Sequence, residues 1–130
     1  MNNKLNQQFR HLMQELFDSV RDVLCFESWS VDQKGSIIVG KLIGNNGHVK
    51  LLYGPPEYHV EIFLISSATG KEYDLAQMMS VKGVREWMEE NRLSFGDYGL
   101  SSDFEWVKSF LINAVSNNEE FNLETLSVRP

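Results

Sequence analysis

The first part of the chain repeats its apolar residues at intervals of three and four positions. This series begins at Leu5 and ends at Leu24, and it passes through Phe9, Leu12, Met13, Leu16, Phe17, Val20 and Val23. Polar and charged residues occupy most of the positions between them. Such spacing places one broad apolar stripe along a single helix face. The pattern therefore predicts one long helix over residues 5–24.

Beyond Gly35 the pattern changes to short runs with the alternation and composition of β-strands. Gly and Asn at 44–47, Pro at 55–56 and Gly70 supply the turns that separate these runs. The predicted strands cover residues 37–43, 48–53, 58–65 and, as a short fourth run, 71–73. Because the runs follow one another with short turns between them, we expect an antiparallel meander of three to four strands.

Helical signals return after the strands. Asp74 and Gln77 have the spacing of a capping box for a short helix, which we expect over residues 75–79. A second helix is predicted to start after Ser80, since that residue type caps helices well. The apolar stripe of this second helix consists of Val81, Val84, Trp87 and Met88.

The last predicted helix runs from about residue 102 to 115, because Ser102 and Glu105 also have capping-box spacing. Residues 93–101 form a loop in this prediction, and residues 117–130 form a polar, loosely ordered tail. Runs of strands followed by runs of helices are typical of α+β proteins. We therefore expect a single α+β domain over residues 1–130, with two to three C-terminal helices packed on one sheet face.

Composition and charge narrow the class of protein. The net charge is −6 and the isoelectric point is near 5.0, which disfavours binding along nucleic-acid phosphates. Apolar residues make up 42% of the chain, enough for a core without disulfide or metal. No secretory signal and no membrane-spanning run is present, and the one cysteine is unpaired. We therefore expect a cytoplasmic protein that does not bind membranes, with Cys25 as a small buried hydrophobe.

The chain carries no phosphate-binding glycine loop, no dinucleotide fingerprint and no nucleophile elbow. His59 and Glu61 share a predicted strand face, where Glu61 could orient a histidine base, but a solvated strand face explains this pair equally well. No zinc-type set of cysteines and histidines can be assembled. We expect no cofactor, no metal ion and no catalytic residue.

Negative charge is concentrated in the C-terminal part. Residues 1–50 contain six basic and five acidic side chains, whereas residues 51–130 contain six basic and thirteen acidic ones. One explanation is solubility and helix capping. The other is a docking surface for a basic partner, with opposite fields that speed encounter. The partner-binding residues in this second hypothesis are Glu86, Glu89, Glu90, Asp97, Tyr98, Asp103 and Glu105.

In general style the chain resembles the immunity proteins of bacterial polymorphic and contact-dependent toxin systems. The resemblance is carried by Tyr58-His59-Val60-Glu61-Ile62-Phe63, Gly70-Lys71-Glu72-Tyr73-Asp74-Leu75 and Val84-Arg85-Glu86-Trp87. It implies direct binding to a cognate toxin domain, often a basic nuclease.

Two other hypotheses stay open. A type III secretion chaperone is also small and acidic and starts with an amphipathic helix, but it has two further strands between its later helices and forms a dimer. A small enzyme that uses His59 and Glu61 is the third hypothesis. The sequence leaves the oligomeric state open.

Overall fold

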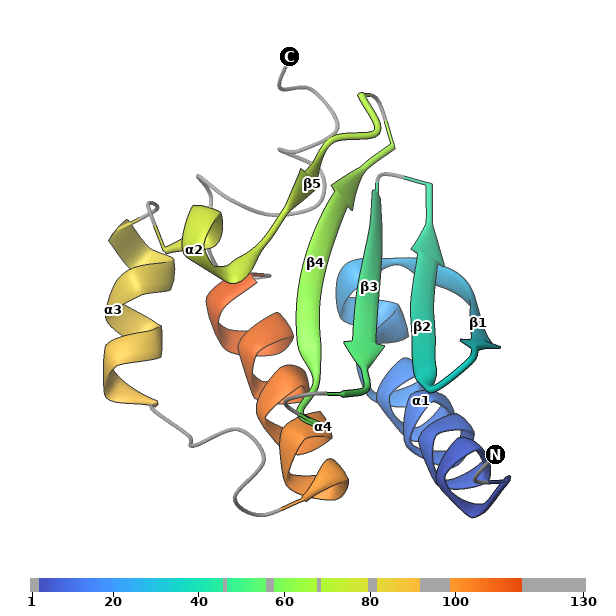
Figure 1. Cartoon of the computed structure of the whole chain (residues 1–130). Helices are drawn as coiled ribbons and strands as arrows, with labels where there is room; N and C mark the ends of the chain where they lie inside the picture. The colour runs from blue at the N-terminus through green and yellow to red at the C-terminus, as the bar shows by residue number, and fades with distance from the viewer. Residues whose placement is uncertain are drawn as a thin grey trace.

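A five-stranded antiparallel sheet lies at the centre of the protein, with helices from both ends of the chain around it (Figure 1). The computed structural model describes residues 3–45, 47–55, 58–67, 69–79, 82–91 and 99–115. In chain order its elements are α1 (Asn3–Leu24), β1 (Phe26–Lys34), β2 (Ile37–Gly44), β3 (Gly47–Tyr53), β4 (Glu61–Ser66), β5 (Glu72–Tyr73), α2 (Leu75–Met78), α3 (Lys82–Glu90), α4 (Leu100–Ser109) and the π-helical turn η1 (Phe110–Val115). The predicted α+β class is confirmed.

The sheet is a meander, because its strands lie in the order β1-β2-β3-β4-β5 and each neighbouring pair is antiparallel. It has five strands where the sequence predicted three to four, and the additional strand is β1. A register shift between Phe26 and Ser28 marks a β-bulge in this strand. Because of the bulge, Phe26 and Trp29 are three positions apart instead of two. This spacing conceals the two-residue alternation of β1 that Val31 and Gln33 continue.

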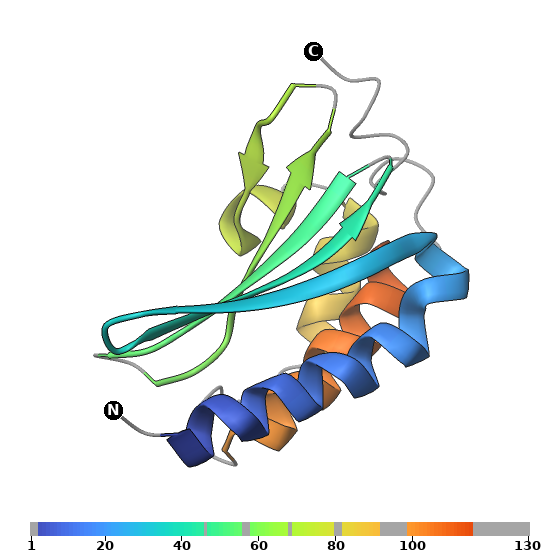
Figure 2. The ribbon, with the colours of Figure 1, turned by 90° about the vertical axis from the view of Figure 1, so that its right-hand side faces the viewer.

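Alternation along β2, β3 and β4 gives the sheet one buried face and one open face. Figure 2 shows α1, α3 and α4 together on one side of the sheet. The strand residues that point toward this helical side are fully or almost fully buried. They include Ile38, Leu42, Val49, Leu51, Ile62 and Leu64.

Helix α1 confirms the predicted amphipathic helix. Its stripe residues Phe9, Met13, Leu16 and Val20 are at most 3% exposed. The helix lies very close to β2, because a Cβ atom added to Gly40 would sit 2.8 Å from both Met13 Sδ and Phe9 Cε1. A side chain at position 40 would therefore force the Met13 and Phe9 side chains to shift.

The capping box that starts α2 is confirmed. The backbone N–H of Gln77 donates to Asp74 Oδ1 at 2.8 Å, and the backbone N–H of Asp74 donates to Gln77 Oε1 at 2.9 Å. In α3, Val84 is buried and Trp87 is half-buried, as their predicted stripe requires. Ser80 and Val81 lie outside the described residues.

Helix α4 begins earlier than predicted. Its first residue is Leu100, and its N-cap is Gly99, with φ +88° and no capping side chain. The predicted capping box of Ser102 and Glu105 is therefore wrong, since both residues already lie inside the helix. The described part of the helical segment runs to Val115, and its last six residues form the π-helical turn η1. Most of the predicted loop and all of the predicted tail lie outside the described residues.

Cys25 lies at the turn between α1 and β1. The residue is exposed, so the prediction of a buried small hydrophobe is wrong. Its backbone has φ +57°, the left-handed conformation that reverses the chain direction after α1. The following residue, Phe26, takes the buried position instead.

Candidate functional site

The three predicted acids of α3 are exposed. Glu86, Glu89 and Glu90 lie on the outer side of a helix whose other side packs through Val84 and Trp87. The Trp87 ring lies 5.6 Å from the Trp106 ring and 5.8 Å from the Phe110 ring, measured between centroids. These contacts hold α3 against α4 and η1, so that its carboxylates face outward on the helical side of the protein.

Asp103 does not belong to an exposed acidic surface. The residue is only 4% exposed, and its Oδ2 atom accepts a hydrogen bond from the backbone N–H of Val60 at 3.0 Å. Its charge also acts on Tyr53. Burial raises the pKa of the Tyr53 phenol, and the nearby Asp103 carboxylate and Tyr58 raise it further. Asp103 is therefore a structural residue of the core, and its assignment to the docking surface is corrected.

Glu105 is the predicted acid of α4 that does reach the surface, with its side chain 72% exposed. Lys108, one turn further along α4, lies 3.3 Å from its Oε2 atom. The remaining two predicted residues, Asp97 and Tyr98, lie outside the described residues. The predicted set is thus divided among an exposed face of α3, a buried site and an exposed position on α4.

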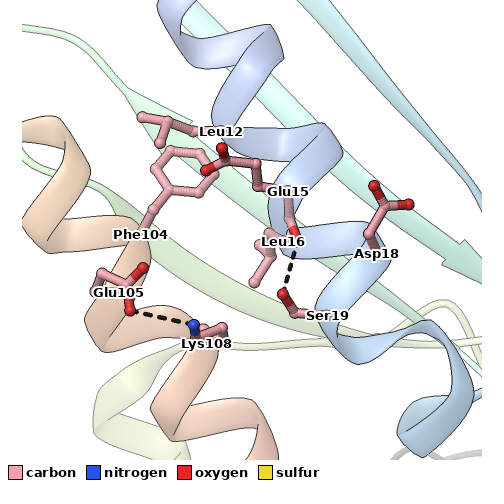
Figure 3. A pocket seen from close by; sticks show the side chains of 8 residues that line it. All are labelled: Leu12, Glu15, Leu16, Asp18, Ser19, Phe104, Glu105 and Lys108. Atoms are coloured by element: carbon pink, nitrogen blue, oxygen red, sulfur yellow. Dashed lines mark hydrogen bonds and ion pairs between the residues drawn. The ribbon is translucent and has the colours of Figure 1, made fainter.

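Glu105 lies on one wall of a groove between α1 and α4 (Figure 3). The groove has a volume of about 300 Å³. Three carboxylates and one ammonium group line it, together with apolar side chains and one hydroxyl. The lining residues are Leu12, Glu15, Leu16, Asp18, Ser19, Phe104, Glu105 and Lys108.

The rotation of about 100° per residue along α1 separates its charges onto two flanks of the apolar stripe. Glu15 falls on the flank beside α4, whereas Arg10 and Arg21 fall on the flank beside β1. Arg10 Nη2 donates to the carbonyl oxygen of Val31 on β1 at 3.0 Å, and the Arg21 guanidinium lies 5.3 Å from the centroid of the Phe17 ring. Arg10 and Arg21 are thus turned away from the groove.

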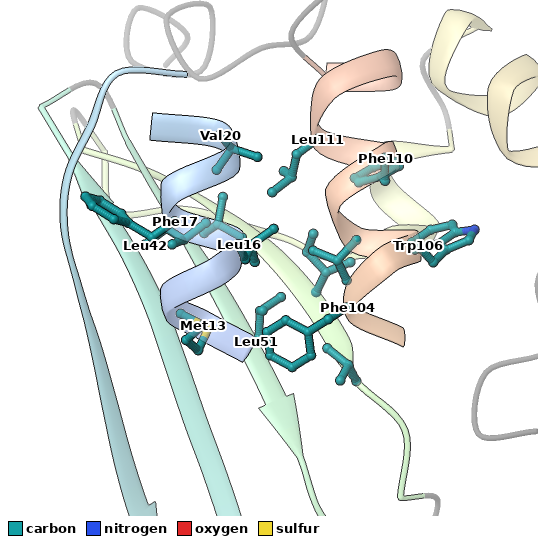
Figure 4. Close-up of a cluster of buried hydrophobic side chains, with 14 of the residues drawn as sticks. Met13, Leu16, Phe17, Val20, Leu42, Leu51, Phe104, Trp106, Phe110 and Leu111 are labelled. Carbon is teal, nitrogen blue, oxygen red and sulfur yellow. The ribbon is translucent and has the colours of Figure 1, made fainter. Parts of the chain in front are cut away.

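The floor of the groove is apolar and belongs to the main core. Leu16 and Phe104 are buried and meet between α1 and α4, as Figure 4 shows, and Leu12 is half-buried beside them. The acidic groups above this floor remain accessible. Glu15 pairs with His11 at 2.9 Å, yet 61% of its side chain is exposed. The apolar floor of the groove is therefore bordered by carboxylates that cations in solution can reach.

His59 and Glu61 do not share a strand face as predicted, because β4 begins at Glu61 and His59 precedes it. Both line a second pocket, of about 320 Å³, beside Asp74 and Leu75 at the start of α2. The Asp74 carboxylate is engaged as the cap of α2, because it accepts the Gln77 N–H. Glu61 is exposed at the start of β4.

No group of three or more His, Cys, Asp or Glu residues within the described ranges is arranged to hold a metal ion. None of the helices in those ranges is both long and apolar enough to cross a membrane. Comparison of the chain with family models, with curated proteins and with solved structures finds no match. A proposal for the function therefore rests on the physical features of the protein surface.

Two groove residues, Glu15 and Asp18, were missed by the sequence analysis. The reason is that residues 1–50 together are nearly neutral, with six basic and five acidic side chains, so no acidic surface was expected there. A signal was present, since Glu15 and Asp18 are three positions apart and flank the apolar pair Leu12 and Leu16 on one side of a helix. What the sequence could not show is that Glu105 lies across from them.

Proposed function

We propose that this is a non-catalytic binding protein whose groove between α1 and α4 docks a basic segment of a partner protein. The observation that carries this proposal is the placement of Glu15 and Glu105, from two helices far apart in the chain, on either side of one apolar floor. Asp18 lies at the outer rim, where its Oδ1 atom accepts a hydrogen bond from Gln14 Nε2 at 3.0 Å. The α3 carboxylates extend the acidic character of the same helical side. The assignment to α1 and α4 replaces the single C-terminal patch expected from the sequence.

The chemistry of the groove fits lysine and arginine side chains. Their aliphatic stems can cover Leu12 and Phe104, while their charged ends reach the carboxylates of the rim. Pairs of this kind speed association by steering and fix the register of the partner. Glu105 already has Lys108 as a neighbour, but this exposed pair is weak and can exchange for a partner's cation.

Within this class, the immunity role is the form of the proposal that agrees with the resemblance given above. A basic toxin domain would present cations to the carboxylates of the groove, and neutralisation by direct binding needs no catalytic group.

Co-expression with a toxin domain encoded beside the gene tests this function. Cells that make the toxin domain should survive when the wild-type protein is present. The double variant Glu15→Lys/Glu105→Lys should protect poorly, whereas Glu27→Lys, at an exposed site on β1, should protect fully. If the wild-type protein gives no protection, or the double variant protects as well as wild type, the proposal is wrong.

A further inference from the structure

Polar side chains of α1 bond along β1, the strand at one edge of the sheet (Figure 1). Three α1 residues spaced four positions apart each bond to one of three strand residues spaced two positions apart. The bonds are Asn6 Nδ2 to Gln33 Oε1 at 2.9 Å, Arg10 Nη2 to the Val31 carbonyl oxygen at 3.0 Å and Trp29 Nε1 to Gln14 Oε1 at 3.0 Å. Four residues of helix and two residues of strand both advance by about 6 Å, so the bonds stay in step.

The bond to Val31 occupies a backbone group that points away from β2. Lys34 and Ile37 flank the two-residue turn of the β1–β2 hairpin, and Gly35 in this turn has φ +62°. The residue pair next to such a turn exchanges hydrogen bonds, and pairs with and without bonds alternate from there. Val31, opposite Gly40, falls in a pair without bonds, so its N–H and C=O groups point outward from the sheet edge.

Arg10 closes the middle of this edge. By the same alternation, the backbone groups of Trp29 and Gln33 also point outward, on either side of Val31. An edge of this kind is a template for another strand. An added strand would need the Val31 carbonyl oxygen as an acceptor, and the Arg10 guanidinium already occupies this atom. Asn6 holds the guanidinium there, since Arg10 Nε donates to Asn6 Oδ1 at 2.9 Å.

The opposite edge of the sheet is closed by other contacts. The two residues of β5 pair with Leu64 and Ile65 on β4. Asp103 accepts the N–H of Val60, which directly precedes β4, at 3.0 Å. Ile62 lies between these contacts and is only 1% exposed. Of the two sheet edges in the described residues, β1 therefore offers the longer row of outward-facing backbone groups.

We propose that Arg10 blocks the β1 edge and thereby keeps β1 of a second copy from adding to the sheet as a further strand. Edge strands are often protected by proline, lysine or a bulge. The bulge near Phe26 protects the start of β1, whereas the regular part from Ser28 to Lys34 contains no proline. Arg10 bonds to the middle of this regular part. The proposal is independent of the proposed function, since Arg10 lies on the flank of α1 away from the groove.

A second β1 strand is the occupant that matches this edge. In an antiparallel pair with both Val31 residues opposite each other, the outward-facing groups of the two strands can bond. Ser30 then lies opposite Asp32 of the second copy, and Ser28 lies opposite Lys34 of the second copy. No like charges are opposite each other between residues 28 and 34, so charge does not prevent the pairing. Arg10 prevents it, because it occupies the Val31 carbonyl oxygen.

Nuclear magnetic resonance of the full chain, labelled at the backbone amides, tests this inference. The probe is a synthetic peptide with the sequence of residues 26–34, and the same peptide with proline in place of its valine is the control. Arg10→Ala should bind the probe about tenfold more tightly than wild type does. The amide signals of Trp29, Val31 and Gln33 should shift most. The proline peptide should bind neither protein, because it lacks the central N–H donor.

Two further variants control for the loss of charge and for the loss of stability. Arg21→Ala removes the same charge from α1, at a position where the guanidinium lies over the Phe17 ring instead of the β1 edge, so its affinity should equal that of wild type. Arg10→Met keeps an unbranched side chain but has no donor group. It should bind the probe as tightly as Arg10→Ala, and it keeps the test valid if alanine destabilises the fold.

Three results would overturn this inference. One is that neither Arg10 variant binds the probe more tightly than wild type does. Another is that the proline peptide binds these variants as tightly as the probe, since backbone pairing would then play no part. The third is that the probe shifts signals of the groove or of β4 and leaves those of β1 unchanged.

Discussion

The carboxylate of Asp103 on α4 accepts a hydrogen bond from the backbone N–H of Val60 at 3.0 Å, across a separation of 43 residues. Val60 directly precedes β4 and is 1% exposed. Its N–H group is therefore shielded from water and depends on Asp103 for a partner. This one bond ties the first turn of the last helix to the entry of a central strand.

Asp103→Ala is expected to lower the free energy of unfolding by about 1 to 3 kcal/mol, because it leaves the buried N–H of Val60 without an acceptor. Urea denaturation of wild type and variant at neutral pH measures this difference. Asp103→Asn keeps an oxygen acceptor of the same shape, so a smaller loss is expected. Equal stability of wild type and Asp103→Ala would show that the bond is not needed.

The stability of the protein is expected to fall in alkaline solution because of Tyr53. Its folded-state pKa is raised above 10.0 by burial, by Asp103 and by Tyr58. The unfolded chain therefore releases the phenolic proton first, so the stabilising contribution is complete below pH 10.0 and is lost as pH rises through the folded pKa. Urea denaturation at about pH 8 and at about pH 11 measures this loss. Tyr53→Phe should show a smaller decrease between the two, and an identical decrease would exclude Tyr53 as its source.

Asp74→Ala should remove the cap of α2. The expected loss is about 1 kcal/mol in the free energy of unfolding, since the Gln77 N–H loses its acceptor and the reciprocal bond loses its geometry. Asp22→Ala is the matched control, because Asp22 is exposed near the end of α1, where a carboxylate caps nothing. Thermal unfolding of both variants separates the cap from the general effect of losing a charge. Equal effects of the two substitutions would contradict the role of the capping box.

The groove variants should fold normally. Glu15 and Glu105 are mostly exposed, and their contacts with His11 and Lys108 are solvent-accessible. Reversal of both charges should therefore change the free energy of unfolding by no more than about 0.5 kcal/mol each. Thermal unfolding of Glu15→Lys/Glu105→Lys checks this. A large loss of stability would mean that these acids support the fold and that binding data on the variant cannot be assigned to the groove.

Local patterns in the sequence predicted much of the fold. The apolar stripe of α1 repeats over several turns, so its period is unambiguous, and the capping box of Asp74 and Gln77 acts between neighbours in the chain. Strand β1 was not predicted, because a β-bulge interrupts its alternation after Phe26. The start of α4 was predicted too late in the chain, because its N-cap is Gly99, which has no capping side chain.

The candidate site was harder to predict, because tertiary packing creates it. Asp103 has the sequence signature of an acid near a helix N-terminus, which is usually exposed, but its partner Val60 is distant in the chain. Glu15 and Glu105 come to one groove only because α1 and α4 pack side by side through Leu16 and Phe104. Counting charges along the chain cannot show which helix faces become neighbours.

The association rate between this protein and a basic partner, for which the proposal names any toxin domain encoded beside the gene, tests the role of the groove most directly when it is measured by stopped flow at several salt concentrations. Glu15→Lys/Glu105→Lys should slow association at low salt by about tenfold or more, and its rate should depend less on salt than that of wild type. Glu27→Lys should keep at least most of the wild-type rate. Equal rates for wild type and the double variant at every salt concentration would contradict the assignment of the groove as the docking site.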